Sequence, residues 1–393
     1  MRPAARVQAA IELLDAVIDA AQAKGAPADR LIAEYFRARR YAGSKDRRAV
    51  RELVYRAVRL CGPVPQSGRA AMHALALDDE ILLPMFDGSG HGPAPIDPDE
   101  QPAQTGIAPD WLARRLEISG IAGEEATALL ERAPLDVRVN TLKTDRDTID
   151  LPEAGENLSA PDAIRLPAGT NVERWEAFSD GLIEIQDHGS QWVCRAIEAQ
   201  AGETILDLCA GAGGKTLAIA AATGNGATLI ASDTDARRLG NLAPRARRAG
   251  ADIAHTLLLD PGREEDALAP YLGKVDRVLV DAPCSGSGTW RRNPESRWRL
   301  DPAELRRLTK LQDSVLDLGA KAVAPGGRLT FVTCSVLDEE GANRIDSFLS
   351  RHDGWTADEI AIQIGARRGK GRRMTPFQDA TDGFFVANLR RAC

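Results

Sequence analysis

Residues 207–216 read DLCAGAGGKT, a glycine-rich turn that directly follows a short apolar run. A strand that enters such a turn, with a helix behind it, is typical of an α/β domain that binds a nucleotide or nucleoside. A phosphate loop requires the pattern G-x-x-x-x-G-K-[ST], but the position five residues before Gly214 is Cys209. A dinucleotide fingerprint, G-x-G-x-x-G, that starts at Gly211 needs a third glycine where Thr216 stands. Both patterns fail, so the turn holds another kind of ligand.

Alternating strand and helix patterns continue from this turn to the end of the chain. They predict a parallel sheet with helices on both faces, an α/β, doubly wound, Rossmann-like domain. The predicted strands are ETILDLC (203–209), ATLIASD (227–233), AHTLLLD (254–260), DRVLVDAP (276–283), GRLTFVTCS (327–335) and GFFVANLRR (383–391). Four of the first five run into an acidic residue or a cysteine. In such folds ligands bind at that edge of the sheet.

The preceding residues predict further domains. Apolar residues recur at helical spacing over residues 7–60, and a stretch rich in Pro, Gly and Asp follows further on. Strands around 137–142 and 181–187, with a helix over 111–132, predict a small α+β piece. The predicted parts are an all-α domain over 1–86, a linker over 87–109, a small α+β domain over 110–180 and the α/β domain over 181–393.

Composition excludes several classes of protein. The six cysteines form no C-x-x-C pair, which argues against a zinc site or a disulfide framework, so no metal is expected. No run of eighteen apolar residues occurs, so we expect no membrane span and a cytoplasmic protein. The net charge is −7, yet residues 1–60 contain thirteen Arg or Lys and seven Asp or Glu. Such a basic module can bind a polyanion locally, although a solvated helical face explains the same charges.

Acidic residues at the ends of the next two strands indicate which ligand the turn holds. Asp233 lies where a carboxylate can bind the ribose hydroxyls of a nucleoside, and Asp260 lies where an adenine edge can be read. This layout predicts a site for S-adenosyl-L-methionine, although an ordinary α/β domain with capped strand ends has similar features. The predicted cofactor contacts are Cys209, Ala210, Gly211, Ala212, Gly213, Gly214, Lys215, Asp233, Asp260 and Asp281.

Two cysteines follow the fourth and fifth strands. Asp281 and Cys284 stand in DAPCSGSGTWRRNPESRWR (281–299), and Cys334 stands in VTCSVLDEE (332–340). If these strands flank the first strand, both thiols face the cofactor. Carbon 5 of cytosine is a weak nucleophile, and a thiolate that adds to carbon 6 converts the ring to an enamine. Asp281 can hydrogen-bond to the base, and the second thiol can assist product release. Chemistry alone leaves open which cysteine attacks, and a single cysteine at a strand end is more often a packing residue.

These motifs resemble the RNA cytosine-5 methyltransferases of the RsmB and Sun type, also called the Fmu family. The similarity rests on DLCAGAGGKT, ASDTDARRL, DAPCSGSGTWRRNPESRW, TCSVLDEE and DGFFVANLRR, and it continues more weakly through RVNTLK and IEIQDHGSQW. The basic segment GSKDRRAVRELVYRAVR is similar to the NusB-like helical domain of bacterial RsmB-type enzymes. The resemblance implies a class I methyltransferase fold, with Cys334 as the nucleophile and Cys284 as the residue that assists product release. The family's usual loop is CAAPGGKT, so Gly211 and Ala212 depart from it.

The expected reaction is methylation of carbon 5 of a cytosine in RNA, through a covalent cysteine–cytosine adduct. A NusB-like start favours 16S ribosomal RNA as the substrate by analogy. The same chemistry on transfer RNA is an alternative, and so is a non-catalytic RNA-binding or ribosome-assembly factor. A monomer is expected. The expected RNA contacts are Arg138, Asn140, Arg291, Arg292 and Arg297.

Overall fold

The computed structural model describes residues 1–393, and the chain divides into two compact units. The first unit comprises Met1–Arg132 and Thr289–Glu304, and the second comprises Ala133–Gly288 and Leu305–Cys393. A short segment from the second half of the chain therefore belongs to the unit that the N-terminal residues form. Each unit has its own hydrophobic core.

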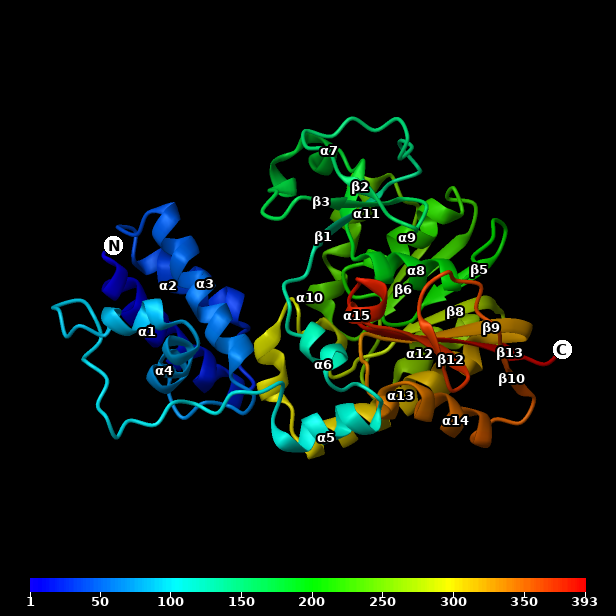
Figure 1. The fold of residues 1–393 in the computed structure, drawn as a ribbon. Helices are drawn as coiled ribbons and strands as arrows, with labels where there is room; N and C mark the ends of the chain where they lie inside the picture. Colours follow the sequence, from blue (N-terminus) through cyan, green and yellow to red (C-terminus); the bar gives the residue numbers. More distant parts are fainter. The chain divides into compact units, whose positions relative to one another are not determined.

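The first unit is helical (Figure 1). Its helices and 3-10 turns are α1 (Pro3–Gln22), α2 (Ala28–Ala38), α3 (Ser44–Leu60), α4 (Gly68–Asp78), η1 (Glu80–Met85), α5 (Asp110–Ile118), α6 (Glu124–Ala128) and η5 (Pro294–Arg299). Helices α1, α3 and α4 bury their apolar faces against one another. Gly68 allows α4 to begin against α1, because a Cβ there would lie 2.3 Å from the carbonyl oxygen of Ile11. The predicted N-terminal helices are present, whereas the likeness to NusB stays a prediction.

The segment predicted as a linker, 87–109, contains no helix and joins no sheet, but its backbone bonds to the helical unit. The Ala103 amide donates to the Ala70 carbonyl at 3.0 Å, and Arg69 forms an ion pair with Glu100 at 2.7 Å. The helix predicted over 111–132 is wrong in its length, because α5 and α6 are separate. Between them Gly120 adopts a left-handed φ of +77°, which ends the first helix.

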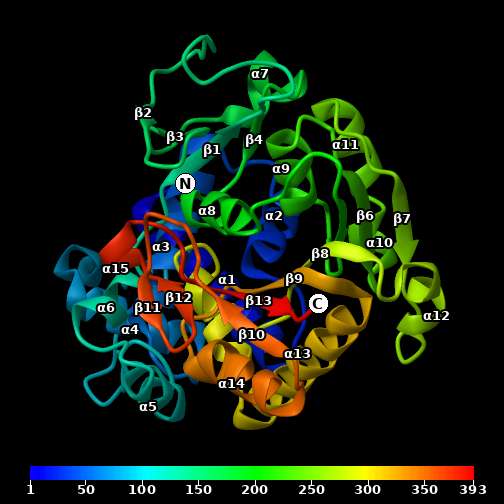
Figure 2. The ribbon, with the colours of Figure 1, turned by 90° about the vertical axis from the view of Figure 1, so that its right-hand side faces the viewer.

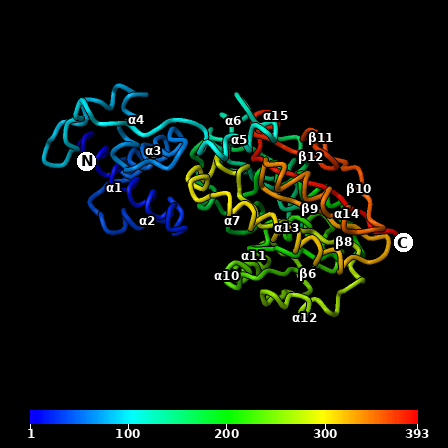
Figure 3. The backbone as a smooth tube through the Cα atoms, turned by 90° about the horizontal axis from the view of Figure 1, so that it is seen from below, coloured from blue at the N-terminus to red at the C-terminus, as the bar shows by residue number.

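The segment Thr289–Glu304 completes the helical core (Figures 1 and 3, yellow beside the blue helices). Trp298 is buried among the apolar residues of α1 and α3, and its indole N–H donates to the Gly62 carbonyl at 3.2 Å. The Arg297 guanidinium donates to the carbonyls of Val58 at 2.5 Å and Cys61 at 2.8 Å. These bonds satisfy carbonyl groups at the end of α3, which have no partner inside that helix.

The second unit is built on a nine-stranded mixed sheet with the order β11-β12-β13-β9-β8-β5-β6-β7, in which β10 also pairs with β13. Its strands are β5 (Thr204–Asp207), β6 (Thr228–Asp233), β7 (His255–Leu258), β8 (Val275–Asp281), β9 (Val323–Thr333), β10 (Trp355–Asp358), β11 (Ala366–Arg368), β12 (Gly371–Met374) and β13 (Phe384–Arg391). The six predicted strands are confirmed. The fourth strand, β8, flanks the first strand, β5, as predicted, but the fifth does not, because β9 pairs with the other side of β8 and β6 is the second neighbour of β5.

Helices cover both faces of this sheet (Figure 2), which confirms the doubly wound α/β fold. One face carries α8 (His188–Ala196), α9 (Gly214–Ala222), α10 (Ala236–Leu239) and α11 (Leu242–Ala249); the other carries α12 (Glu264–Leu268), α13 (Pro302–Ala322) and α14 (Ala342–Arg351). Short elements connect these layers: η3 (Ala269–Tyr271), η4 (Ser287–Thr289), η6 (Asp338–Glu340) and α15 (Pro376–Asp379). Along β5, Ile205 and Leu206 enter the cores on opposite faces, as strand geometry requires. None of the helices combines the length and hydropathy needed to cross a bilayer.

A second, antiparallel sheet has the order β2-β3-β1-β4. Its elements are β1 (Leu135–Val139), β2 (Glu156–Asn157), β3 (Ala163–Leu166), η2 (Val172–Arg174), α7 (Glu176–Ser179) and β4 (Ile183–Ile185). Strand β4 pairs with β1, so the strand predicted over 181–187 joins this sheet, and the predicted domain boundary at residue 181 falls too early in the chain. Ile183 packs with Val137 and Val139 in the core under this small sheet, which holds β4 there.

Candidate active site

The glycine-rich turn between β5 and α9 is held by backbone hydrogen bonds. The Ala210 amide donates to the Ser232 carbonyl at 2.8 Å, and the Gly211 amide donates to Asp233 Oδ2 at 2.7 Å. Gly211 and Gly213 have left-handed φ values of +55° and +84°, which explains why glycine stands at both positions. The loop thus has a defined shape although it lacks the family's proline.

The start of α9 leaves room for a ligand. Apart from its chain neighbours and the backbone of its own helix, no atom lies within 4 Å of the position that a Cβ at Gly214 would take, whereas a Cβ at Gly213 would lie 2.1 Å from Leu242 Cδ1. Behind the loop, Thr216 Oγ1 donates to Asp207 Oδ2 at 2.7 Å, and Asp207 Oδ1 is buried without a partner. Burial raises the pKa of Asp207 to about 7. Asp207 was not predicted as a site residue, although its position at the end of β5 is a signal that could have identified it.

A cleft of about 740 Å³ opens at the carboxyl ends of β5, β6 and β8. This volume suits a nucleoside-sized ligand. Its lining includes Leu208, Cys209, Asp233, Asp235, Arg238, Asp281, Cys284 and Cys334. The sheet therefore brings together residues predicted from four separate motifs. Asp260 lies beyond the end of β7, is exposed and does not line the cleft.

The two thiols are adjacent. Cys284 Sγ and Cys334 Sγ lie 3.3 Å apart, and both cysteines are half-buried and reduced. The hydrogen bond to Cys334, together with burial, raises the pKa of the Cys284 thiol well above its ordinary value. At the same mouth of the cleft, Lys215 Nζ lies 2.6 Å from Asp281 Oδ2. Because β8 and β9 are neighbours, the loops that follow them meet at one point.

A buried carboxyl group, Glu340, connects these two loops, and sequence reasoning did not single it out. Its Oε1 accepts hydrogen bonds from the Ser285 amide at 2.8 Å and from Gln312 Nε2 at 3.0 Å, and its backbone carbonyl accepts from Thr333 Oγ1 at 3.0 Å. Burial raises the pKa of Glu340. Ser285 follows Cys284 directly and Thr333 precedes Cys334, so this network fixes the backbone on which both thiols stand.

Comparison with known proteins identifies the family. A family model described as "16S rRNA methyltransferase RsmB/F" matches residues 194–390. The chain belongs to this family. "Ribosomal RNA small subunit methyltransferase B" of Citrobacter koseri is 36% identical over 293 residues, covering 72% of this chain and 66% of that protein. The Sodalis glossinidius protein of the same name is 33% identical over 294 residues, covering 72% and 65%. This RsmB/F-family chain thus matches slightly less than two thirds of the length of these relatives.

Solved structures show the same fold. The crystal structure of PH0851 superposes with a TM-score of 0.76 over 98% of this chain and 99% of its own, at 23% identity. The structure of NSun6 from Pyrococcus horikoshii with SFG superposes with a TM-score of 0.63 over 72% of this chain and 98% of its own, at 20% identity. The predicted family, the class I methyltransferase fold and the S-adenosyl-L-methionine cofactor are confirmed.

The cleft fits this cofactor. Asp233 lines it, and although both Asp233 oxygens accept backbone amides, each keeps a further lone pair for a ribose hydroxyl. Leu208 and Cys209 supply an apolar wall, and the open space at Gly214 lets backbone amides approach the ligand. The individual cofactor contacts remain predictions. No cluster of His, Cys, Asp or Glu side chains is arranged to hold a metal ion.

The residues predicted to contact RNA lie mostly inside the protein. The prediction is wrong for Arg297. Its side chain is fully buried and its guanidinium binds carbonyls of the helical unit. Arg138 is 4% exposed and donates to Gln186 Oε1 at 2.8 Å, while Asn140 is 1% exposed and donates to the Ala249 carbonyl at 2.7 Å. Arg291 is 6% exposed, and Arg292 is half-buried. Basic residue type did not predict exposure here, because arginine can satisfy buried carbonyl groups.

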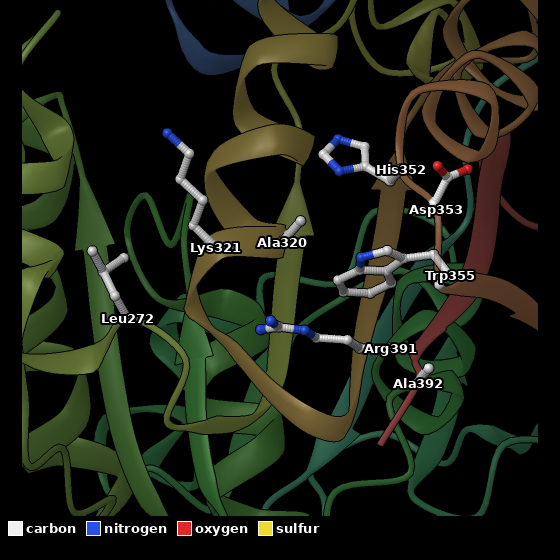
Figure 4. A pocket seen from close by; sticks show the side chains of 9 residues that line it. Leu272, Ala320, Lys321, His352, Asp353, Trp355, Arg391 and Ala392 are labelled. Carbon is white, nitrogen blue, oxygen red and sulfur yellow. The ribbon is translucent and has the colours of Figure 1, made fainter.

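A second cavity, of about 580 Å³, lies at the opposite edge of the sheet (Figure 4). It is lined by Trp355, His352 and Arg391 among others. Two of its polar side chains already have protein partners: His352 Nε2 lies 2.8 Å from Asp317 Oδ1, and Arg391 donates to the Val323 carbonyl at 2.6 Å. No predicted site residue lines it, whereas residues from four of the predicted motifs line the cleft at the cysteines.

Proposed function

We propose that this protein transfers a methyl group from S-adenosyl-L-methionine to carbon 5 of a cytosine in 16S ribosomal RNA. The observation that carries the proposal is the pair of thiols, 3.3 Å apart, beside Asp281 in the cofactor cleft. The description of the family model and the names of the relatives support the choice of RNA. When bound, the cofactor supplies an electrophilic methyl group.

Cys334 is the proposed nucleophile. Its sulfur adds to carbon 6 of the base, which makes carbon 5 electron-rich and able to accept the methyl group. The raised pKa of Cys284 keeps a proton on that sulfur, so Cys284 can donate a hydrogen bond to the Cys334 thiolate. This arrangement leaves Cys334 as the sulfur that attacks the base.

Asp281 is the proposed base-recognition residue. Its Oδ2 is held by Lys215 at 2.6 Å, and its Oδ1 accepts no hydrogen bond from the protein. Oδ1 can therefore accept a hydrogen bond from the exocyclic amine of cytosine while Lys215 fixes the carboxylate. This contact orients the ring so that carbon 6 faces the thiol.

Cys284 is proposed to assist the last step. After methylation, the bond between carbon 6 and Cys334 Sγ breaks, the proton on carbon 5 passes to the Cys284 sulfur as that sulfur gives up its own proton, and the aromatic ring re-forms. The departing sulfur gains a hydrogen-bond donor or a proton from Cys284, which lies 3.3 Å away. Without that thiol the covalent adduct should persist.

A basic hairpin is the proposed RNA-contacting surface, and it replaces the buried arginines in that role. The β11–β12 hairpin, ARRGKGRRM (366–374), contains five cations and no acid. Arg367, Lys370 and Arg372 line a groove of about 520 Å³, and neither Arg367 nor Arg372 has a carboxylate partner. Two acids, Asp358 and Glu359, also line the groove, but Asp358 is neutralised by ion pairs with two arginines. Strand β12 is two positions from β9, roughly 10 Å at ordinary strand spacing.

Replacing Arg367 and Lys370 together by glutamine is expected to weaken RNA binding. Each phosphate contact on a single strand contributes about 0.7 to the slope of log K against log salt, so the slope should fall by about 1.4. Fluorescence anisotropy over a salt series measures both quantities. Lys274→Gln is the matched control, since this exposed cation lies just before the central strand β8, three strand positions from β12. An unchanged slope in the double variant would show that RNA binds elsewhere.

Purified protein, labelled cofactor and three RNA samples test the function itself. Isolated 16S ribosomal RNA, assembled small subunits and transfer RNA are incubated in parallel, and mass spectrometry locates any 5-methylcytosine. Label in 16S ribosomal RNA, free or assembled, supports the proposal. Label in transfer RNA alone establishes the alternative substrate. Cofactor and RNA binding without any methyl transfer would make the protein an RNA-binding factor and overturn the enzymatic assignment.

A further inference from the structure

A charged bridge runs from the cofactor loop to the small sheet. Arg245, on α11, donates through Nη1 to the carbonyl oxygen of Ala212 at 2.8 Å and through Nη2 to Glu184 Oε2 at 2.8 Å. Ala212 belongs to the glycine-rich loop, and Glu184 belongs to β4. We propose that Arg245 is a positioning residue that holds this loop in the shape that binds the cofactor.

Glu184 is a fixed anchor for this bridge. Its side chain is only 4% exposed, and it forms ion pairs with both Arg245 and Arg248. The guanidinium of Arg248 in turn lies over the Phe178 ring, 4.2 Å from its centroid. A buried carboxylate between two arginines is satisfied on both oxygens, which fixes the Arg245 fork geometrically.

The loop needs an external restraint at this point. Gly211 is in the left-handed region with φ +55°, where glycine is conformationally free, and Ala212 lacks the fixed φ that proline would impose. The Gly211 amide is tied to Asp233, which restrains one side of the turn. Arg245 restrains the next residue through its carbonyl. The bridge therefore substitutes a side-chain contact for the rigidity that CAAPGGKT loops gain from proline.

Arg248 provides the matched comparison. It shares Glu184 with Arg245 and lies on the same helix, but no hydrogen bond joins it to the cofactor loop. If the arginines only fasten α11 to the small sheet, the two alanine variants should behave alike. If Arg245 positions the loop, only Arg245→Ala should weaken cofactor binding. The proposal holds whichever RNA is methylated.

The test measures the affinity of the Arg245→Ala, Arg245→Lys and Arg248→Ala variants of the full chain for S-adenosylhomocysteine by calorimetry. Thermal unfolding of each variant is followed in parallel. Arg245→Ala should raise Kd about tenfold, the effect of losing one charge-assisted hydrogen bond, while Arg248→Ala stays within about twofold of wild type. Arg245→Lys keeps the charge without the two-pronged geometry, so its Kd should lie between those of wild type and Arg245→Ala.

Equal changes in Kd for Arg245→Ala and Arg248→Ala would overturn the proposal, as would a native Kd in a folded Arg245→Ala protein. If Arg245→Ala does not fold, Arg245→Lys decides: a raised Kd at native thermal stability supports positioning, and a native Kd contradicts it. This assay contains no RNA, so it tests the role of Arg245 independently of the proposed function. Wild-type protein that binds S-adenosylhomocysteine but methylates no RNA would refute the proposed function, and the comparison of the Arg245 and Arg248 variants would still be valid.

Discussion

Replacing Cys334 by alanine is expected to lower the rate of methyl transfer at least roughly 1,000-fold, because no other group can add to carbon 6 and activate carbon 5. Cys284 lies 3.3 Å away but is held as a neutral thiol by its hydrogen bond and burial. Single-turnover transfer of a labelled methyl group measures the effect. The affinity for S-adenosylhomocysteine should stay near its wild-type value, because Cys334 is only one of many residues that line the cleft and the loop proposed to bind the cofactor follows a different strand, β5.

Cys393→Ala is the control for the loss of a thiol, because Cys393 is exposed at the end of the chain. It should leave the transfer rate unchanged. A Cys334→Ala protein that keeps more than about a tenth of the wild-type rate would contradict the assignment of the nucleophile.

Replacing Asp281 by asparagine is expected to lower kcat/KM for RNA by roughly 100- to 1,000-fold. Asparagine has the shape of aspartate but no charge, so Lys215 loses its partner and the base loses a fixed acceptor. Steady-state kinetics with a defined RNA fragment measure the change. Because Asp281 also lines the cofactor cleft, calorimetry with S-adenosylhomocysteine separates the two roles.

Asp276→Asn is the control for this variant. Asp276 lies near the start of the same strand, β8, and accepts a hydrogen bond from the Thr204 amide at 2.8 Å. Its replacement should affect stability more than catalysis. If Asp281→Asn fails only to bind the cofactor, and methylates normally when the cofactor is saturating, the base-recognition role is wrong.

The positions of the main strands could be predicted from the sequence. Apolar runs and glycine-rich turns located all six predicted strands, since these signals depend on neighbouring residues. The order of the strands in the sheet was harder to predict. The pairing of β9 with β8 and not with β5 depends on contacts between residues that lie far apart in the sequence. The short strands β11 and β12 were missed, since their arginine-rich sequence lacks the apolar alternation of a strand.

The sequence predicted which residues come together where backbone geometry brings them together, and it misjudged which basic residues are exposed. The residues that follow strand ends converge because parallel strands deliver them to one edge, as Cys284 and Cys334 illustrate. The arginines after Cys284 were predicted to contact RNA because their run is basic and aromatic, but Arg297 is buried and bonds to carbonyl groups of the helical unit. Glu340 was missed because an acid within an acidic run has no sequence signal for burial.

The covalent adduct is the most direct test of the proposed mechanism. The Cys284→Ala variant is incubated with the cofactor and the RNA substrate, denatured, and examined for a protein–RNA species of increased mass. The mechanism predicts that this adduct accumulates in Cys284→Ala and is absent when Cys334 is also replaced by alanine. An adduct that forms in Cys334→Ala and is lost in Cys284→Ala would contradict it and would make Cys284 the nucleophile.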